Sequence, residues 1–251
     1  MDWVRDFFDD GYRFLYGDML SPERTEFEVA GLVQLTGLRE GARVLDLCCG
    51  DGRHSVPLQR RGHRVTGVDL SRKLLTRAQQ RAERVLPEDQ APPVWIEADA
   101  RKVPVRDESF TLAICLFNSI GYGTDDDTRA MLGAARRAIE PNGAFVLECT
   151  HRDFLVREAT DGRTRRTVQV SGVPVEFETW IDAEPGLQPA RMACPRNGQR
   201  FERKPVHRMF TLTALFAMLR AAGFHTLDAW GDYDARPFSI AHDKVVIRAR
   251  P

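Results

Sequence analysis

Residues 43–55 read Arg-Val-Leu-Asp-Leu-Cys-Cys-Gly-Asp-Gly-Arg-His-Ser, and this stretch decides the fold. Its apolar run at 44–47 has the length and composition of one buried parallel strand. A turn of small residues follows at 48–52, and its two glycines can adopt backbone angles that are closed to other residues. A helical pattern begins at Arg53. A strand, a glycine turn and a helix N-terminus together predict a cradle for a nucleotide-like ligand.

The acids in and around this turn indicate which ligand it binds. Only Gly50 and Gly52 fit the three-glycine fingerprint of dinucleotide-binding turns, because Ser55 stands where the third glycine belongs. Asp46 and Asp51 would also repel the two phosphates of a dinucleotide. No Lys-Ser or Lys-Thr follows the turn, so the P-loop pattern is absent as well. A cofactor with an ammonium, a sulfonium and a carboxylate fits better, because it places positive charge near Asp46.

The segment Val-Leu-Asp-Leu-Cys-Cys-Gly-Asp-Gly at 44–52 resembles motif I of the class I S-adenosylmethionine-dependent methyltransferases. That motif consists of two hydrophobic residues, Asp, another hydrophobic residue, two variable residues and Gly-x-Gly. The resemblance implies an α/β fold with a Rossmann-like, doubly wound, seven-stranded sheet. It also implies S-adenosyl-L-methionine as cofactor and S-adenosyl-L-homocysteine as product. We therefore expect an enzyme that transfers a methyl group to a nitrogen or oxygen of a small-molecule acceptor.

Two further acids follow at the ends of successive predicted strands. Asp69 ends the strand at 64–68 and lies 69 − 46 = 23 residues after Asp46, where an acid can accept hydrogen bonds from ribose hydroxyls. Asp99 follows the strand at 94–97, and the resemblance implies that it accepts a hydrogen bond from the adenine amine. The other residues expected at the cofactor flank these positions, cover the cofactor or offer a cation to its carboxylate: Cys48, Arg53, Leu70, Ala100, Phe117, Tyr16 and Arg24.

Three parts are expected along the chain: an N-terminal helical lid at 1–40, a Rossmann-like core at 41–151 and 211–251, and an antiparallel β insert at 152–210. Ser21-Pro22 supplies the N-cap and the first position of the second lid helix. Residues 110–117 form the most continuous apolar run and predict the central fourth strand. Within the insert, apolar and polar residues alternate between turns, which indicates antiparallel strands. This insert would form a wall of the acceptor pocket or a dimer contact.

Methyl transfer from a sulfonium depends mainly on holding the acceptor lone pair close to the methyl group. Proximity contributes about 7–11 kcal/mol to lowering the barrier, whereas a general base typically adds about 10²–10⁴-fold. Residues 117–122 resemble the Phe-x-Ser-Ile-Gly-His/Tyr loop of small-molecule methyltransferases, including N-methyltransferases of amino sugars, which implies that Tyr122 lies beside the acceptor. His151 follows a strand tip on the same edge and suits a base, and Tyr12 would join from the lid. Further base candidates are Tyr16, His207 and His242.

No metal site is expected. The aspartate run at 125–127 opens a predicted helix that ends near Pro141, and acids are favoured at the positive end of a helix dipole. The five cysteines form no Cys-x-x-Cys pair and no His/Cys zinc spacing. An odd count without an export signal predicts reduced thiols.

Composition bounds the partners. The 251 residues carry 36 basic and 36 acidic side chains, so no nucleic-acid partner is expected. No apolar run approaches membrane-spanning length, and the acidic N-terminus does not resemble a signal peptide. We therefore expect a cytoplasmic monomer or homodimer without a membrane partner.

Two other functions stay open at this point. A nucleotide-cofactor (NAD-type) oxidoreductase would use the same strand-turn-helix unit, although the third glycine is absent. A non-catalytic protein could also keep the S-adenosylmethionine site without transferring a methyl group.

Overall fold

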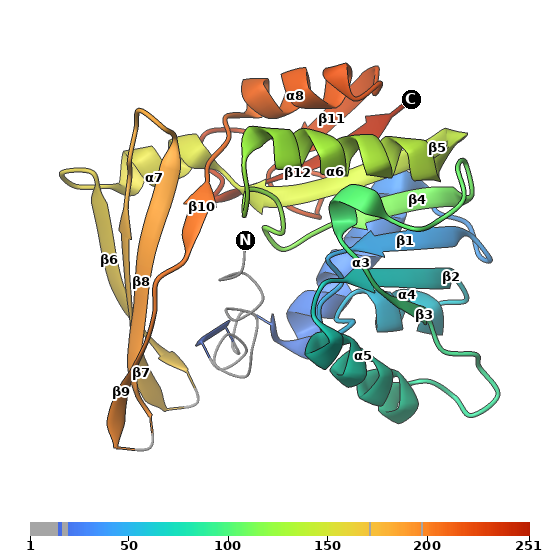
Figure 1. Cartoon of the computed structure of the whole chain (residues 1–251), viewed down its shortest axis with the longest axis horizontal. Coiled ribbons are helices and arrows are strands. Elements are labelled where there is room, and N and C mark those ends of the chain that lie inside the picture. Colours follow the sequence, from blue (N-terminus) through green and yellow to red (C-terminus); the bar gives the residue numbers. More distant parts are fainter. Residues whose placement is uncertain (1–14, 17–19, 171, 197) are drawn as a thin grey trace.

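The structure is a computed structural model that describes residues 15–16, 20–170, 172–196 and 198–251 (Figure 1). Tyr12 and the rest of residues 1–14 of the predicted lid lie outside the described residues. The described chain forms a seven-stranded core sheet with helices on both faces and a separate antiparallel sheet beside it.

The core sheet has the strand order β11-β12-β5-β4-β1-β2-β3. Its strands are β1 Arg43–Leu47, β2 Arg64–Asp69, β3 Val94–Glu97, β4 Phe110–Cys115, β5 Ile139–Thr150, β11 Thr226–Trp230 and β12 Lys244–Arg250. Strands β1 to β5 pair in parallel, and β12 runs antiparallel to both of its neighbours. The predicted Rossmann-like, doubly wound α/β fold is therefore confirmed. The strand order reverses between β1 and β4, which places the ligand crevice at their carboxyl ends.

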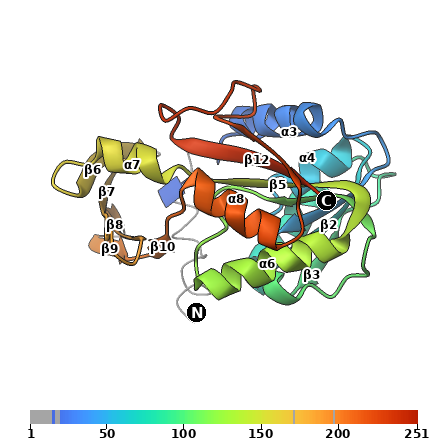
Figure 2. The same cartoon turned by 90° about the horizontal axis from the view of Figure 1, so that it is seen from above.

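Helices cover both faces of this sheet (Figure 2). The helices are α3 Pro22–Thr36, α4 Ser55–Arg60, α5 Arg72–Val85, α6 Asp125–Ala138 and α8 Leu212–Ala221. Successive β1 side chains point to opposite faces, so Val44 packs with α3 and α4, whereas Leu45 packs with α6 and α8. The two resulting clusters hold the strand ends in fixed positions.

Helix α3 is a layer of the core, which corrects its prediction as part of a lid. Its N-cap is as predicted, with the Ser21 side chain accepting from the backbone N–H of Arg24, and Gly37 ends the helix with a left-handed backbone at φ 64°. However, Val29 and Leu32 are fully buried against the sheet. Lifting the helix would return both side chains to water, at a cost of about 1.5–3 kcal/mol each.

Two boundaries differ from the prediction. Helix α4 begins at Ser55 instead of Arg53, because Gly52 is left-handed at φ 74° and the preceding residues form a turn. Strand β5 begins at Ile139, directly after α6, whereas the apolar run of the sequence predicts its start at Ala144. In the pairing of β5 with β4, Ile139 lies opposite Phe110 and Ala144 lies opposite Leu112, so residues 140–143 form an irregularity opposite Thr111. The chain therefore passes from helix to strand without a separate loop.

The insert comprises α7 Arg152–Glu158, β6 Arg163–Val170, β7 Val173–Trp180, β8 Leu187–Arg196, β9 Gln199–Arg203 and β10 Val206–Arg208. Its strands pair antiparallel in the order β10-β8-β7-β6, with β9 also on β8. One face carries an apolar cluster that includes Tyr16 and Phe177. On the other face Glu178 pairs with Arg165 and Arg191. The insert thus has an apolar face and a charged face.

No helix within the described residues is both long and apolar enough to cross a bilayer.

Candidate functional site

The turn between β1 and α4 has the backbone that its glycines allow. Gly50 and Gly52 are left-handed at φ 57° and 74°, and Cys48 joins them at φ 59°. A Cβ at position 52 would lie 2.8 Å from the Trp95 ring, whereas position 50 has open space around it. Gly52 is therefore required for packing, and Gly50 leaves the main chain accessible to a ligand.

A cavity that we call the turn pocket lies at the carboxyl ends of β1, β2, β3 and β4. The sequence-predicted residues that line it are Asp46, Cys48, Gly50, Arg53, Asp69, Leu70, Asp99, Ala100, Phe117 and Tyr122. Gly52, Tyr16 and Arg24 do not line it. The structure thus brings the three predicted strand-end acids to one cavity.

Asp46 is a buried carboxyl group that is hydrogen-bonded to the hydroxyl of Ser55. It is 2% exposed and accepts a hydrogen bond from Ser55 Oγ at 2.5 Å. Burial raises the pKa of Asp46 to about 7; the nearby charge of Asp69 adds to this rise, while Ser55 and Arg53 oppose it. Such a carboxyl group gains stability when a cation is brought beside it. Asp46 therefore suits the ammonium of a ligand.

Asp69 holds the glycine turn and still faces the pocket. One carboxylate oxygen accepts from the backbone N–H of Gly50 at 2.9 Å, and the other accepts from that of Ser71 at 2.8 Å. Burial raises the pKa of Asp69, and these two hydrogen bonds oppose the rise. Each oxygen keeps a second lone pair, so the carboxylate can also accept from two ligand hydroxyls.

Asp99 is shared with an arginine that the sequence reasoning missed. It caps the short helix η2 (Ala100–Lys102) and is paired with Arg101, which also pairs with Asp127 of α6. The hydrogen bonds from Arg101 lower the pKa of Asp99. All three side chains line the turn pocket. An adenine amine at Asp99 would therefore share the carboxylate with a guanidinium.

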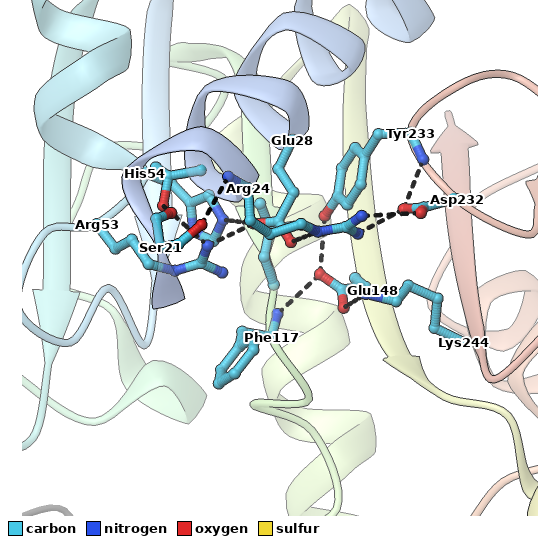
Figure 3. A network of polar contacts seen from close by, with 12 residues as sticks. Ser21, Arg24, Glu28, Arg53, His54, Phe117, Glu148, Asp232, Tyr233 and Lys244 are labelled. Carbon is cyan, nitrogen blue, oxygen red and sulfur yellow. Dashed lines mark hydrogen bonds and ion pairs between the residues drawn. The ribbon is translucent and has the colours of Figure 1, made fainter. Parts of the chain in front are cut away.

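Glu28 of α3 organises a buried polar network that the sequence reasoning also missed (Figure 3). It is 1% exposed, and its oxygens lie 2.8 Å from Arg24 Nε, 2.6 Å from Arg53 Nη1 and 2.9 Å from His54 Nε2. Burial alone would raise the pKa of Glu28, but the His54 hydrogen bond and the arginine charges hold it well below its usual range. The available signal was an acid on the apolar stripe of the helix, one turn before Leu32.

Arg53 has one guanidinium nitrogen left for a ligand. Nη1 is bound to Glu28, whereas Nη2 is enclosed and has no hydrogen-bonding partner among the described residues. The guanidinium lies 4.9 Å over the Phe117 ring. A carboxylate is the natural partner for such a nitrogen. Arg53 thus lines the turn pocket, and its pairing with the cofactor carboxylate stays a prediction.

Arg24 does not lie where the prediction placed it. Its Nη atoms bond both oxygens of Asp232 at 2.6 and 2.9 Å, and its Nε bonds Glu28. The side chain lies outside the turn pocket, because this two-pronged pair turns it toward the loop after β11. It is a structural ion pair in this protein.

A second cavity, which we call the insert pocket, lies between the core and the apolar face of the insert. Its lining includes Glu148, Phe154, Phe177, Met192, His207 and Lys244. Phe117 and Tyr122 line both pockets and so stand at their junction. Tyr16 lines the insert pocket instead of the turn pocket, because its ring packs edge-on against Phe117 and Phe177 at 6.1 and 6.2 Å.

His151, a predicted base, lies outside both pockets. Its Nδ1 is 3.0 Å from the carbonyl oxygen of His242, its backbone N–H donates to that of Asp243, and its ring packs on Phe238. These contacts join the end of β5 to the loop before β12. The His242 ring bonds Ser239 and also lies outside both pockets. Neither histidine is therefore retained as a base.

His207 of β10 lines the insert pocket as a neutral group. Its ring packs edge-on against Tyr122 with 4.8 Å between centroids, and its Nε2 has no hydrogen-bonding partner among the described residues. Burial lowers the pKa of His207 to about 4, although the carbonyls of Ile120 and Asn118 oppose this. Its imidazole is therefore a weak base at neutral pH.

Replacing His207 with phenylalanine is expected to reduce the loss of stability on acidification. The pKa is lower in the folded state than in the unfolded state, so the unfolded chain gains the proton first. Stability therefore falls between about pH 6.5 and pH 4, by up to about 3 kcal/mol from this residue. Denaturant unfolding at pH 7.5 and 4.5 should show a loss about 2–3 kcal/mol smaller in the variant. The pKa values of His54 and His63 are also lowered, so the wild type and the variant should both lose stability on acidification. The measured quantity is therefore the difference between the losses of the two proteins, and equal losses would contradict the prediction.

Glu148 is a buried carboxylate in the insert pocket that the sequence reasoning missed. It is 4% exposed, and its Oε2 accepts from the Tyr233 hydroxyl at 2.9 Å and from the Phe117 N–H at 3.2 Å. Lys244 Nζ lies 3.6 Å from its Oε1 (Figure 3). The available signal was a charge within the apolar run of β5.

The aspartates at 125–127 act as a helix start. Thr124 and Asp127 form a reciprocal capping box at the N-terminus of α6. Among the described residues, no group of histidine, cysteine or acidic side chains could hold a metal ion, and the five cysteines form no disulfide bond.

Comparison with known proteins agrees with this geometry. Residues 44–143 match the family described as a methyltransferase domain. A 2-phytyl-1,4-naphtoquinone methyltransferase of Trichormus variabilis is 34% identical over 125 residues, which are 48% of this chain and 52% of the relative. The chain thus spans about half the length of the curated relatives that it matches.

Solved structures resemble nearly the whole chain. The CcbJ methyltransferase from Streptomyces caelestis has a TM-score of 0.79 at 22% identity and covers 90% of this chain and 89% of its own. The S-adenosylmethionine-bound CalS10, an amino pentose methyltransferase from Micromonospora echinaspora, has a TM-score of 0.65 at 21% identity and covers 91% of both chains. These likenesses concern the fold. Residues 44–143, which match the methyltransferase domain, contain the glycine turn and lie within a fold that the chain shares with these solved structures.

Proposed function

We propose that this protein transfers a methyl group from S-adenosylmethionine in the turn pocket to a small-molecule acceptor in the insert pocket. The observation that carries the proposal is the convergence of Asp46, Asp69 and Asp99 on one cavity. Phosphate-bearing cofactors fit this cavity poorly, because three carboxylates would face their charge.

The residues of the turn pocket fit S-adenosylmethionine group by group. Asp46 would take the ammonium, and the unpartnered Nη2 of Arg53 would take the carboxylate. Asp69 would accept from the ribose hydroxyls, and Asp99 from the adenine amine beside Arg101. The cofactor, when bound, supplies a methyl group activated by the sulfonium charge.

The chain's own contribution to the reaction is chiefly positioning. Phe117 and Tyr122 stand between the two pockets, so an acceptor in the insert pocket would meet the methyl group across these rings. Holding both reactants in place can account for about 7–11 kcal/mol of barrier lowering.

We infer that the acceptor atom is nitrogen. A hydroxyl must lose its proton to a base, and neither the two tyrosines nor the histidine that line the insert pocket are suited to take it. Burial raises the pKa of Tyr16 to about 12 and raises that of Tyr122 further, so both stay protonated. His207 is a weak base. A neutral amine needs no such help, because its lone pair is already available.

Calorimetry with S-adenosylmethionine, S-adenosylhomocysteine and NAD(H) tests the cofactor assignment. Both adenosyl compounds should bind with one site per chain, and NAD(H) should not bind. Binding of NAD(H) alone would favour the oxidoreductase. Tight binding of S-adenosylmethionine without turnover of any amine or alcohol would favour a non-catalytic binding protein.

Replacing Asp69 with alanine is expected to weaken S-adenosylhomocysteine binding by about 1–3 kcal/mol, because the ribose loses a charged hydrogen-bonding partner. The same calorimetric titration measures it. Asp126→Ala is the matched control, since that carboxylate lies on the surface with its side chain 92% exposed. Unchanged affinity in the Asp69 variant would remove this residue from the site.

A further inference from the structure

We propose that Glu148 is the residue that binds the acceptor amine, with Oε1 receiving its N–H and stabilising the positive charge that the nitrogen acquires. This inference rests on the proposed function and names the chemistry of its second substrate. It follows from the asymmetry between the two oxygens of one buried carboxylate.

The two oxygens of Glu148 have different surroundings. Oε2 is fixed by the Tyr233 hydroxyl at 2.9 Å and the Phe117 N–H at 3.2 Å. Oε1 has no hydrogen-bonding partner among the described residues, and it is not among the fully enclosed polar atoms. Since Glu148 lines the insert pocket, Oε1 is the oxygen that a ligand there can reach.

The position of this oxygen suits the reaction. Phe117 lines both pockets, and its backbone N–H donates to Oε2 of Glu148. The carboxylate of Glu148 is therefore bonded to a residue at the junction of the two pockets. Tyr233 is itself 1% exposed and packs in the core, which holds Oε2 and thereby aims Oε1. A preorganised charge acts most strongly where charge develops during the reaction.

The charge balance of the step explains why a carboxylate is useful. The nitrogen lone pair forms the new N–C bond, the electron pair of the old S–C bond stays with sulfur, and the positive charge passes to nitrogen. The amine keeps its protons and leaves as a methylated ammonium. Glu148 faces a neutral amine before this step and an ammonium after it. Its carboxylate therefore attracts the charged product, and the transition state that leads to it, more strongly than the neutral substrate.

Lys244 sets the strength of this attraction. Its Nζ lies 3.6 Å from Oε1, which is ion-pair distance but too long for a hydrogen bond. The position of Lys244 shows that a cation can lie beside Oε1. Lys244 would also compete with a cationic ligand for this oxygen. An ammonium ligand must therefore share Glu148 with Lys244.

A pair of isosteric probes tests the proposal without requiring the natural acceptor. Protonated 2-(dimethylamino)ethanol mimics a methylated ammonium, and 3-methylbutan-1-ol has the same shape without the charge. NMR titration of the S-adenosylhomocysteine-loaded protein should give about tenfold tighter binding of the cation, equivalent to about 1.4 kcal/mol. Equal binding of the two probes would overturn the proposal.

Two variants should shift this preference in opposite directions. Glu148→Gln keeps an oxygen for Tyr233 and Phe117 but removes the charge, so the preference for the cation should disappear. Lys244→Met removes the competing cation, so the preference should increase. Glu158→Gln is the matched control, because that acid also lines the insert pocket but is half exposed and pairs with Arg157.

The outcomes separate this proposal from the function on which it rests. If S-adenosylhomocysteine fails to bind, the proposed function falls. If it binds and Glu148→Gln leaves the cation preference unchanged, only the role of Glu148 falls. A merely structural role for Glu148 would weaken both probes equally and would not make Lys244→Met bind the cation more tightly.

Discussion

Replacing Glu28 with glutamine is expected to lower the free energy of unfolding by about 3–5 kcal/mol, the cost of removing one member of a buried ion pair. The glutamine would leave the guanidinium of Arg53, only 6% exposed, without its counter-charge. His54 and Arg24 would lose a charged partner at the same time. Urea denaturation at pH 7.5 measures the change.

Glu26→Gln provides the control on the same helix. Glu26 pairs with Arg60 and Arg61, but its side chain is 41% exposed, so the substitution should cost no more than about 1 kcal/mol. Similar destabilisation by both substitutions would show that burial does not set the value of the Glu28 network. Glu28→Gln should also weaken S-adenosylmethionine binding, because Arg53 would no longer be held beside the turn pocket.

The second large effect concerns Asp46 and its raised pKa. With the pKa near 7 in the free protein, the carboxyl group must ionise before it can pair with the cofactor ammonium. Affinity for S-adenosylmethionine should therefore fall about tenfold for each pH unit below 7. Calorimetry between pH 5.5 and 8 measures this slope, and the binding reaction should release protons near pH 7.

Asp46→Asn should flatten the slope and weaken binding at pH 8 by about 2–5 kcal/mol, the scale for a buried charge that loses its partner. The same substitution should stabilise the ligand-free protein at pH 8. The raised pKa means that ionising Asp46 costs folding stability as pH rises from about 4 to 7, by up to about 4 kcal/mol. A variant that binds as tightly as the wild type, or that is less stable at pH 8, would contradict both expectations.

These two acids illustrate different routes to a buried charge. Glu28 is surrounded by cations within the protein, so its ionised form stabilises the fold and its pKa is low. Asp46 is buried near the charge of Asp69, and the Ser55 hydrogen bond only partly offsets this, so its ionised form is unfavourable until a ligand supplies the cation. The first therefore serves the structure, and the second serves binding.

The sequence by itself determined the fold and the turn pocket. The apolar run of β1, the left-handed glycines and the acids at successive strand ends are local features, and parallel strands bring their carboxyl ends to one edge of the sheet. Asp46, Asp69, Asp99 and Arg53 could therefore be placed from their spacing and chemistry. The antiparallel insert was visible for the same reason, because its alternating pattern is local.

Only the tertiary structure decided which side chains complete the site. Glu148 meets the Tyr233 hydroxyl across 85 residues of sequence, and Arg24 is drawn away from the turn pocket by Asp232, 208 residues distant. His151 stood at the predicted strand end, yet its ring turns to the loop before β12. Periodicity and spacing report what one segment prefers. The partner that captures a buried charge comes from another segment, so it is known only when the chain has folded.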